Sequence, residues 1–335
     1  MSDLHVEEAS VDDAAAIREV IHSAFAARPR LDPPTRALDE SVASVAAAIE
    51  RDGALLGRVG GIPAGALLFA DEGDGALRLR RVSVLPHLHS RGVASAVVAR
   101  AEEVAAHRGH DDIVLRTRSG LPETVAFWMR RGYAEVERDG TYLTLAKALP
   151  VEVAAGSADD SRALGKRIAA LARPGDVVIL TGELGAGKTT LTQGIATGLQ
   201  VRGRVTSPTF VIARAHPSLV GGPALVHVDA YRLDGTLELD DLDLDTALEE
   251  SVTVVEWGEG VAEGLSTDPL RVRIARLRGD DDVTASPGGE DAGRPGESEV
   301  GLMDLRAITI TPTGARWVGA GVRSHLTASP SQVAL

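Results

Sequence analysis

Apolar residues recur at helical spacing in several stretches of the first half of the chain. Residues 12–27 carry apolar side chains on one helical face, at Ala15, Ile17, Val20, Ile21 and Phe25. The same period predicts further helices over residues 38–49, 91–107 and 123–131. Short apolar and β-branched runs bounded by turn residues predict strands over residues 65–70, 77–84, 113–116 and 142–146. Helices that alternate with strands in this order predict an α/β sheet.

The second half of the chain shows the same alternation. A β-rich run over residues 176–180 precedes a glycine-rich loop, and a helical pattern then continues through residue 199. Further strands are predicted over residues 224–228, 253–256, 271–274 and 307–311. Pro150 separates the two patterns, so we predict two α/β domains, over residues 1–149 and 150–320.

Three segments lack a pattern that could bury a core. Residues 279–300 are rich in Gly, Pro, Asp and Glu, so we expect a disordered insertion. Residues 321–335 show no apolar period, so we expect a loose tail. The run from Asp234 to Glu250 carries acids and no base. This run is either a solvated face or a docking surface for a basic partner.

The composition narrows the chemistry. The 335 residues include no cysteine, which excludes disulfides, thiolate metal sites and cysteine nucleophiles. Only Lys147, Lys166 and Lys188 are lysines, so a lysine within a motif is informative. The net charge of −13 argues against broad non-specific binding of nucleic acid by this chain alone. The sequence contains no run of about 18 apolar residues, and its acidic start is unlike an export signal, so we expect a cytoplasmic protein without a membrane span.

A glycine-rich loop in the second half matches the phosphate-binding pattern G-x-x-x-x-G-K-[ST] without a mismatch, from Gly182 to Thr189. Glycines allow successive backbone N–H groups to face one concavity, where the start of the following helix adds its positive dipole end. A lysine in this pattern reaches the β- and γ-phosphates, and the hydroxyl after it can ligate Mg²⁺. The predicted nucleotide-binding residues are Glu183, Leu184, Gly185, Ala186, Gly187, Lys188, Thr189 and Thr190. The alternative is an ordinary glycine-rich helix cap.

Two acids end predicted strands of the same half. Asp229 follows ALVHV, and Glu256 follows TVV. In an open α/β sheet, such acids lie at the edge that also carries the phosphate loop. The alternative for each is a solvated acid at a strand end. The segment Thr206-Ser-Pro-Thr-Phe210 places hydroxyl groups around a proline, so it is either a switch segment that senses the γ-phosphate or a simple turn.

These elements together resemble the TsaE family, small bacterial ATPases needed to make threonylcarbamoyladenosine in tRNA. The resemblance rests on GELGAGKTTLTQGIATGL, VTSPTF, HVDAYRL and VVEWGE, in this order. It implies the cofactors ATP and Mg²⁺, the partners TsaD and TsaB, and contact with tRNA only through that complex. The roles it implies are phosphate binding for Lys188, Mg²⁺ binding for Thr189 and Glu256, water activation for Asp229, a switch segment of Thr206, Ser207 and Thr209, and nucleotide contact for Ser161, Trp257 and Arg306.

The first half carries a second motif. The segment from Val82 to Ser95, VSVLPHLHSRGVAS, resembles the coenzyme A loop of GNAT acetyltransferases, and residues 123–133 resemble the closing segment of that family. His89 stands where the family usually has Arg or Gln. The resemblance implies that acetyl-CoA is a cofactor and that a helix start receives its pyrophosphate. The predicted cofactor-binding residues are Val82, Val84, Arg91, Gly92, Ala94 and Ser95.

Two positions of the first half depart from the acetyltransferase pattern. Trp128 stands where GNAT enzymes often have a tyrosine that acts as general acid, and indole cannot deliver a proton at neutral pH. Leu121 stands where many relatives have an asparagine that contacts the cofactor. The domain is therefore an acetyltransferase that uses another acid or direct transfer, or else a regulatory or vestigial module. Two alternatives remain for the whole protein: an N-acetyltransferase with a nucleotide sensor, and a nucleotide-gated scaffold.

Overall fold

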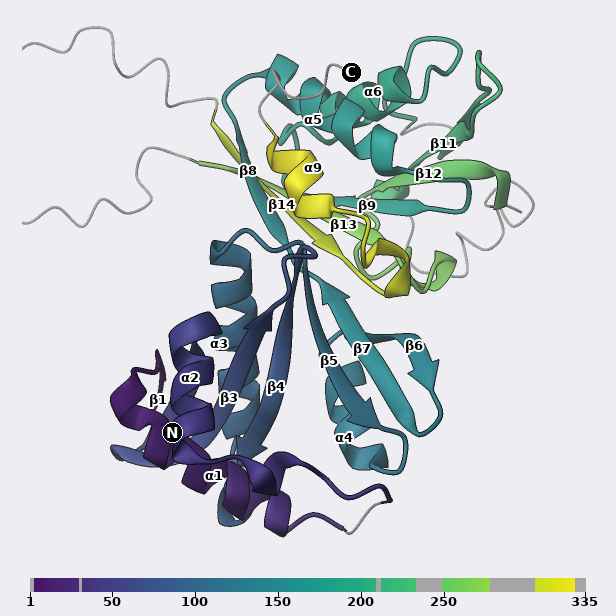
Figure 1. The fold of residues 1–335 in the computed structure, drawn as a ribbon. Helices are drawn as coiled ribbons and strands as arrows, with labels where there is room; N and C mark the ends of the chain where they lie inside the picture. The colour runs from purple at the N-terminus through teal and green to yellow at the C-terminus, as the bar shows by residue number, and fades with distance from the viewer. Residues whose placement is uncertain (1–2, 30–31, 209–211, 233–248, 278–304, 329–335) are drawn as a thin grey trace, which may run out of the picture. The chain divides into compact units, whose positions relative to one another are not determined.

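The computed structural model describes residues 3–29, 32–208, 212–232, 249–277 and 305–328. The chain forms two compact units. The first comprises residues 1–149 together with 314–324, and the second comprises residues 150–313 together with 325–335 (Figure 1). Within the described residues, no helix is both long and apolar enough to cross a membrane.

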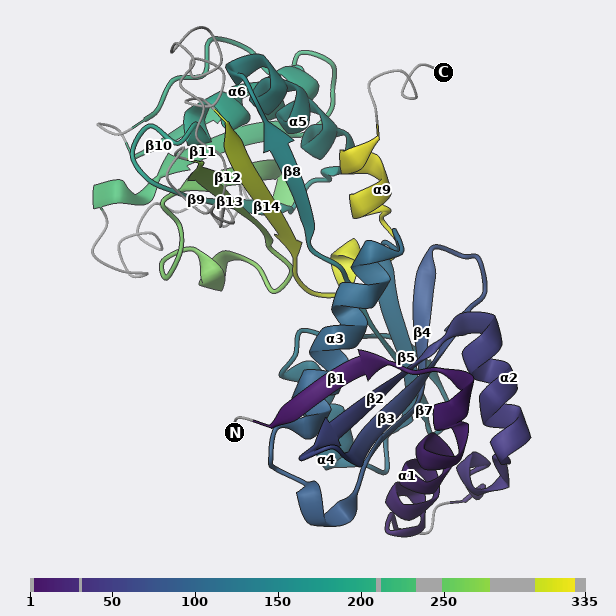
Figure 2. The same cartoon turned by 90° about the vertical axis from the view of Figure 1, so that its left-hand side faces the viewer.

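The first unit is an α/β sandwich around one sheet. Seven strands follow the order β1-β2-β3-β4-β5-β7-β6. Helices α1 and α2 pack on one face of the sheet, and α3 and α4 pack on the other (Figure 2). The elements are β1 (Leu4–Glu8), α1 (Ala14–Ala26), α2 (Val42–Asp52), β2 (Ala54–Val59), β3 (Ile62–Asp71), β4 (Ala76–Val84), α3 (Val93–His107), β5 (Asp112–Arg118), α4 (Pro122–Met129), β6 (Ala134–Asp139) and β7 (Tyr142–Ala148). Each face of the sheet has its own hydrophobic core, and successive residues of a strand point into opposite cores, as Leu55 and Leu56 of β2 do.

The sheet of the first unit opens in its middle. Strands β4 and β5 pair in parallel only from Ala76–Asp112 to Leu79–Leu115. Beyond that point β4 continues to Val84 against β3, and β5 continues to Arg118 against β7. The last residues of the two strands therefore face a gap in the sheet that a ligand can enter.

The second unit is also built on seven strands, in the order β10-β11-β12-β9-β13-β14-β8. The central strands β11, β12, β9 and β13 are parallel, so their carboxyl ends meet at one edge. The elements are β8 (Val151–Ala155), α5 (Ala158–Leu171), β9 (Val177–Thr181), α6 (Lys188–Gly198), β10 (Ala213–His216), β11 (Ala224–Asp229), β12 (Ser251–Glu256), β13 (Leu270–Arg276), β14 (Arg306–Pro312) and α9 (Val322–Thr327), the last of which begins in the first unit.

Helices α5 and α6 approach each other closely at glycines. A Cβ atom on Gly165 would lie 2.4 Å from the Leu191 carbonyl oxygen, and one on Gly194 would lie 2.3 Å from the Arg162 carbonyl oxygen. Only glycine lets the two backbones meet at this distance. The contact holds α6, whose first residues are Lys188 and Thr189, firmly on the unit.

The predicted strands and helices agree with the structure except at some boundaries. The predicted helix over residues 38–49 begins only at Val42, because the Ser41 side chain accepts a hydrogen bond from the Ser44 N–H and caps the helix there. Residues 37–39 form a separate 3₁₀ turn. The insertion expected over residues 279–300 lies outside the described residues.

The end of the chain differs from the expected loose tail. Residues 314–324 belong to the first unit. The long segment of the second unit therefore ends at Thr313, whereas the sequence predicted that this domain extends to residue 320. Trp317 is fully buried and Val322 nearly so. The Gly319 N–H donates to Asp112 at 2.9 Å. The sequence shows no apolar period here because the buried residues are spread over a turn and a short helix, while residues 329–335 lie outside the described part of the chain.

The buried carboxyl group of Asp112 makes the stability of the first unit depend on pH. Burial, together with the nearby charges of Asp111 and Asp74, raises its pKa from 3.8 to about 6, although the hydrogen bond from Gly319 acts in the opposite direction. A raised folded-state pKa favours folding at low pH, and this contribution is lost as the pH rises through about 6.

We therefore expect Asp112→Asn to stabilise the protein more at about pH 7.5 than at about pH 5, because the charged form is then absent from the folded state. Urea unfolding followed by tryptophan fluorescence measures both values. Asp12→Asn, an exposed acid of the same unit, should change stability equally little at both pH values. An equal gain for Asp112→Asn at both pH values would contradict this assignment.

Candidate functional site

The loop between β9 and α6 requires glycine at three positions. Gly182, Gly185 and Gly187 have φ angles of 142°, 75° and 113°, which residues other than glycine rarely adopt. A Cβ on Gly182 would also lie 2.4 Å from the Ile274 carbonyl oxygen. Glu183 and Leu184 are exposed on the rim of the loop, Ala186 is buried, and Thr190 is half-buried in the first turn of α6.

Two arginines hold the loop by its carbonyl groups. The Arg306 Nε donates to the Ala186 carbonyl at 2.8 Å, and Arg276 donates to the Gly185 carbonyl. In a trans peptide the C=O and the following N–H point in opposite directions, so the Gly187 N–H points away from Arg306. The sequence predicted that Arg306 contacts the nucleotide. The structure brings this residue to the loop, where it is buried and bonded to the backbone.

Lys188 lies almost completely buried beneath the loop. Its Nζ donates to the carbonyl oxygens of Gly182 at 2.7 Å and Glu183 at 3.0 Å. The same ammonium lies 3.6 Å from the centre of the Trp257 ring. Burial lowers the pKa of Lys188, although the carboxylates of Glu256 and Asp229 act in the opposite direction. The structure thus brings Lys188, predicted to bind phosphate, against Trp257, predicted to contact the nucleotide.

A buried carboxylate links the loop helix to two strands. Glu256 Oε2 accepts from the Thr189 hydroxyl at 3.0 Å, and its Oε1 lies 2.8 Å from His227 Nε2. A carboxylate only accepts, so Nε2 carries the proton. Glu256 and His227 are both buried, with exposed fractions of 3% and 0%. The predicted pair of Thr189 and Glu256 thus meets, with His227 fixing the carboxylate.

The second strand-end acid lies beside the first. Asp229 pairs with Glu256 in the register of β11 and β12. Asp229 Oδ2 accepts from the Ser207 hydroxyl at 2.7 Å, and Oδ1 accepts from the Tyr231 N–H at 3.1 Å. The predicted switch segment thus reaches the predicted catalytic acid through Ser207. Thr206 is exposed, and Thr209 lies outside the described residues.

Ser161 has a different environment from the one the resemblance implied. This residue lies on α5 with 2% of its surface exposed, and its hydroxyl donates to the Ser157 carbonyl at 3.3 Å. A helical serine commonly satisfies its hydroxyl in this way. The described contacts of Ser161 do not reach the loop.

Sequence reasoning missed three residues of this site: His227, Arg276 and Tyr231. His227 precedes Asp229 by two positions in a strand, so both side chains share a face, and this spacing could have revealed it. Tyr231 lies 5.2 Å from Trp257, measured between ring centres. Arg276 reaches the loop only through the register of β13, which no local pattern encodes.

The first unit contains a cleft of about 2300 Å³ at the gap between β4 and β5. Val82, Val84, Gly92, Ala94 and Ser95, all predicted to bind cofactor, line this cleft. Gly92 caps α3 with a φ of 79°. Arg91 is exposed beside Gly92 and is not part of the lining.

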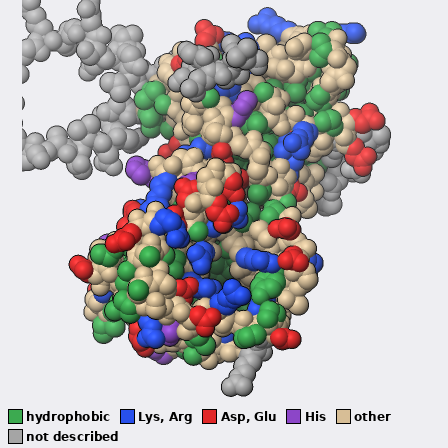
Figure 3. All heavy atoms as spheres, viewed as in Figure 1, with side chains coloured by type: hydrophobic (Ala, Val, Ile, Leu, Met, Phe, Trp, Pro, Cys, Tyr) green, Lys and Arg blue, Asp and Glu red, His purple; other side chains and the backbone are tan. Residues whose placement is uncertain are grey.

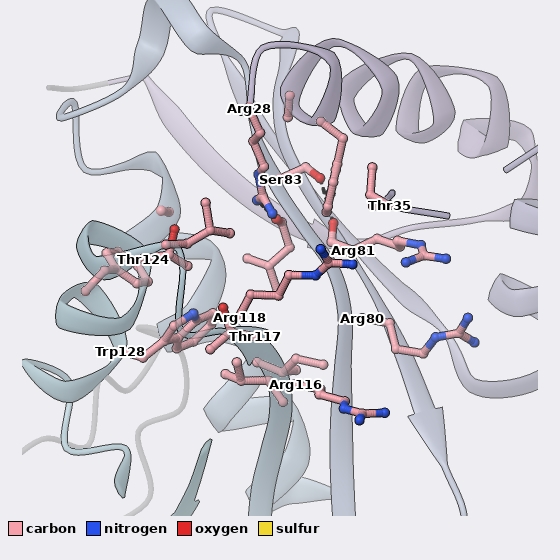
Figure 4. Close-up of a pocket in the computed structure, with 18 of the residues that line it drawn as sticks. Arg28, Thr35, Arg80, Arg81, Ser83, Arg116, Thr117, Arg118, Thr124 and Trp128 are labelled. Atoms are coloured by element: carbon pink, nitrogen blue, oxygen red, sulfur yellow. Dashed lines mark hydrogen bonds between the residues drawn. The ribbon is translucent and has the colours of Figure 1, made fainter. Parts of the chain in front are cut away.

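The wall of the cleft opposite α3 is formed by α4. Leu121 and Trp128 both line it. Figure 4 shows Trp128 among the residues that line the cleft. Its side chain is only 3% exposed and packs edge-to-face on Phe127 and Tyr133, so it also belongs to the core. Burial raises the pKa of Tyr133 well above its usual value, so this phenol stays protonated. Arg131 donates to the Ser95 hydroxyl near the start of α3.

Comparison with known proteins finds two families in the chain. The model for "Threonylcarbamoyl adenosine biosynthesis protein TsaE" matches residues 155–282, and the model for the "Acetyltransferase (GNAT) family" matches residues 14–133. The TsaE protein of Streptomyces coelicolor is 56% identical over 162 residues, which are 48% of this chain and 96% of the relative. The TsaE protein of Mycobacterium tuberculosis is 55% identical over 126 residues, 36% of this chain and 75% of the relative.

Solved structures include similar chains for each unit. Bacillus subtilis YdiB shares 30% identity with a TM-score of 0.37, covering 53% of this chain and 94% of its own. The PaiA N-acetyltransferase of Thermoplasma acidophilum, in complex with coenzyme A, shares 16% identity with a TM-score of 0.40, covering 44% and 99%. On the extent of the match to the Streptomyces protein, the chain belongs to the TsaE family, with a GNAT-family domain preceding its TsaE domain.

Proposed function

We propose that the second unit is a Mg²⁺-dependent ATPase that supports the formation of threonylcarbamoyladenosine in tRNA. The observation that carries the proposal is the contact of Thr189 with the buried pair of Glu256 and His227, next to the buried Lys188. The names of the TsaE relatives supply the pathway. We further propose that the partners are TsaD and TsaB, which would hold the tRNA.

The loop fits the phosphates of a nucleotide. Three glycines with positive φ and two arginines bonded to carbonyl groups leave backbone N–H groups to face a ligand. Lys188 donates to two loop carbonyls, and an ammonium group can exchange such partners for phosphate oxygens. Trp257 and Tyr231 would flank the nucleotide.

The oxygen donors fit Mg²⁺. Thr189 and Glu256 present a hydroxyl and a carboxylate, the hard ligands that Mg²⁺ takes together with substrate phosphates. Within the described residues no cluster of three His, Asp or Glu side chains forms a complete metal cage, so phosphate oxygens would complete the set. When bound, Mg²⁺ would neutralise charge on the β- and γ-phosphates. His227 would keep the Glu256 carboxylate oriented.

Asp229 is suited to orient the attacking water. Its carboxylate lies at the strand edge beside Glu256 and accepts from Ser207 and the Tyr231 N–H. Those two donors fix the direction of the carboxylate. A water held by it would attack the terminal phosphorus, the bond from that phosphorus to the bridging oxygen of ADP would break, and the water's proton would pass to the carboxylate or the phosphate. Ser207 would report the state of the nucleotide to the segment that follows.

Lys188→Ala should reduce ATP hydrolysis by about 100-fold or more, because the buried ammonium stabilises charge that develops on the phosphates. Lys166→Ala, which removes an exposed lysine of α5, serves as the matched control and should retain activity. Both variants are assayed for phosphate release and for tRNA modification with TsaB and TsaD supplied. Full restoration of the modification by Lys188→Ala would rule out the proposed mechanism.

His227→Leu should raise the Mg²⁺ concentration needed for half-maximal ATPase activity by about tenfold, because Glu256 loses the donor that orients it. His227→Gln can still donate from its amide and should restore most of the affinity. His216→Leu, at another buried histidine, controls for the loss of an imidazole. The positioning role fails if the Mg²⁺ dependence of His227→Leu equals that of the unchanged protein.

For the first unit we propose acetyl transfer from acetyl-CoA to an amine. The family match and the cleft lined by Val82, Gly92 and Ser95 support this proposal. The pyrophosphate would bind N–H groups at the start of α3. Buried Trp128 cannot protonate the departing thiolate, so the proton released by the amine would serve that role directly or through water.

Gly92→Glu should abolish acetyl-CoA binding, because it adds a negative charge and a strained side chain where the pyrophosphate is expected. Gly109→Glu is the matched control, since Gly109 also has a positive φ, of 85°, but follows the far end of α3. Calorimetric titration with acetyl-CoA measures the affinity, and thermal unfolding checks that both variants fold. No affinity in the unchanged protein, or equal affinity in both variants, would overturn the proposal.

A further inference from the structure

The cleft of the first unit is lined by many arginines. They are Arg28, Arg36, Arg78, Arg80, Arg81, Arg116, Arg118, Arg130 and Arg131. Only four acids share the lining: Glu72, Glu123, Glu137 and Asp139. The chain as a whole carries a net charge of −13, so this excess of positive charge is local. Figure 3 shows Lys and Arg side chains around a hollow in this unit.

Carboxylates neutralise some of these arginines. Arg78 pairs with Glu72 at 2.8 Å, Arg81 pairs with Glu40 at 2.9 Å, and Arg116 pairs with Asp139 at 2.8 Å. Arg28 and Arg118 differ, because among the described residues no carboxylate lies within ion-pair distance of either. Arg36, Arg80, Arg130 and Arg131 also have no such partner in the described part of the chain, so Arg28 and Arg118 are two of six guanidinium groups in the lining without a carboxylate partner.

Arg28 is held at the gap between the strands. Its guanidinium donates to the Val82 carbonyl on β4 at 3.2 Å and lies 3.9 Å from the centre of the Phe25 ring. Burial lowers its pKa, as expected of a cation with no carboxylate nearby. A partly buried guanidinium without a counter-ion is costly unless a ligand supplies one.

Arg118 approaches the same space from β5. It donates from one nitrogen to the Tyr142 hydroxyl at 2.9 Å, and its other terminal nitrogen is buried without a hydrogen-bond partner among the described residues. Figure 4 shows Arg28 and Arg118 extending toward the same part of the cleft. Two converging guanidinium groups match the oxygens of a carboxylate or a phosphate.

The cofactor alone does not account for this pair. The start of α3 has its own arginine, Arg131, beside Ser95. The cleft of about 2300 Å³ is more than twice the usual ligand pocket of roughly 1,000 Å³, so it has room for a second substrate.

We propose that the amine acetylated in this cleft carries a negatively charged oxygen group, a carboxylate or a phosphate, which Arg28 and Arg118 bind. This inference rests on the acetyl transfer proposed above. The amine nitrogen attacks the thioester carbonyl carbon, a C–N bond forms and the C–S bond breaks. The sulfur leaves with the electron pair, and the proton lost by nitrogen goes to the thiolate. The products are the N-acetylated anion and free coenzyme A.

Matched pairs of amines test the charge requirement with the full chain and acetyl-CoA. β-Alanine is compared with β-alaninamide, and phosphoethanolamine with ethanolamine, so that only one member of each pair carries an anionic group and the two pairs distinguish carboxylate from phosphate. We expect kcat/KM to favour the anionic member of at least one pair by about 30-fold or more, since a desolvated charge pair is worth this much. A preference for the neutral members would overturn the proposal.

Arg28→Gln and Arg118→Gln should each remove that preference while changing the affinity for acetyl-CoA less than about twofold, because the cofactor binds elsewhere. Arg51→Gln, an exposed arginine outside the cleft, is the matched control. If the two variants instead lose acetyl-CoA binding and keep the preference, these arginines serve the cofactor and the inference fails.

Direct binding separates this inference from the acetyl transfer on which it rests. The four amines are titrated into the full chain without acetyl-CoA and followed by calorimetry. Anion binding that Arg28→Gln and Arg118→Gln remove, with no turnover of any amine, would support the anion site and refute the acetyl transfer. Neither binding nor turnover would refute both.

Discussion

The candidate nucleotide site of this protein depends on one buried carboxylate. Glu256 ends strand β12, accepts from Thr189 at the start of α6 and lies against His227 of β11. A carboxylate removed from water is stable only when donors satisfy its oxygens, so these contacts join the loop helix to two strands. Asp229 lies next to Glu256 because the parallel register places the ends of β11 and β12 opposite each other. The geometry of the site is thus set by the sheet and not by the loop alone.

The loop is held from two sides. Glycines allow its backbone to turn, and the close approach of α5 and α6 at Gly165 and Gly194 fixes the helix that follows. Arg276 of β13 and Arg306 of β14 each donate a hydrogen bond to one loop carbonyl, and Lys188, beneath the loop, donates to two others. A loop whose carbonyls are already bonded can present its amides to phosphate with little reorganisation, which is the physical advantage of a preorganised site.

The N-terminal unit handles charge in another way. Its sheet separates after Leu79 and Leu115, and the ends of β4 and β5 that no longer pair with each other carry Arg80, Arg81, Arg116 and Arg118. Carboxylates of the unit form ion pairs with Arg81 and Arg116. Arg28 and Arg118 are bonded instead to a carbonyl and a hydroxyl group, and no carboxylate of the described residues lies within ion-pair distance of them. The acidity of the chain as a whole is therefore no guide to the ligands of this unit. Local potential, and not net charge, selects what enters a cleft.

The sequence by itself determined the two α/β units, the phosphate loop and the strand-end acids, because periodicity, glycine spacing and residue type act locally. It missed short or exposed strands such as β1 and β6, whose side chains alternate weakly, and it missed the burial of Trp317 in the first unit. Only the tertiary structure brought His227 to Glu256, Arg276 and Arg306 to the loop, and Arg28 to Val82. These contacts join residues far apart in the chain, so strand register and helix packing decide them, and no local pattern records either.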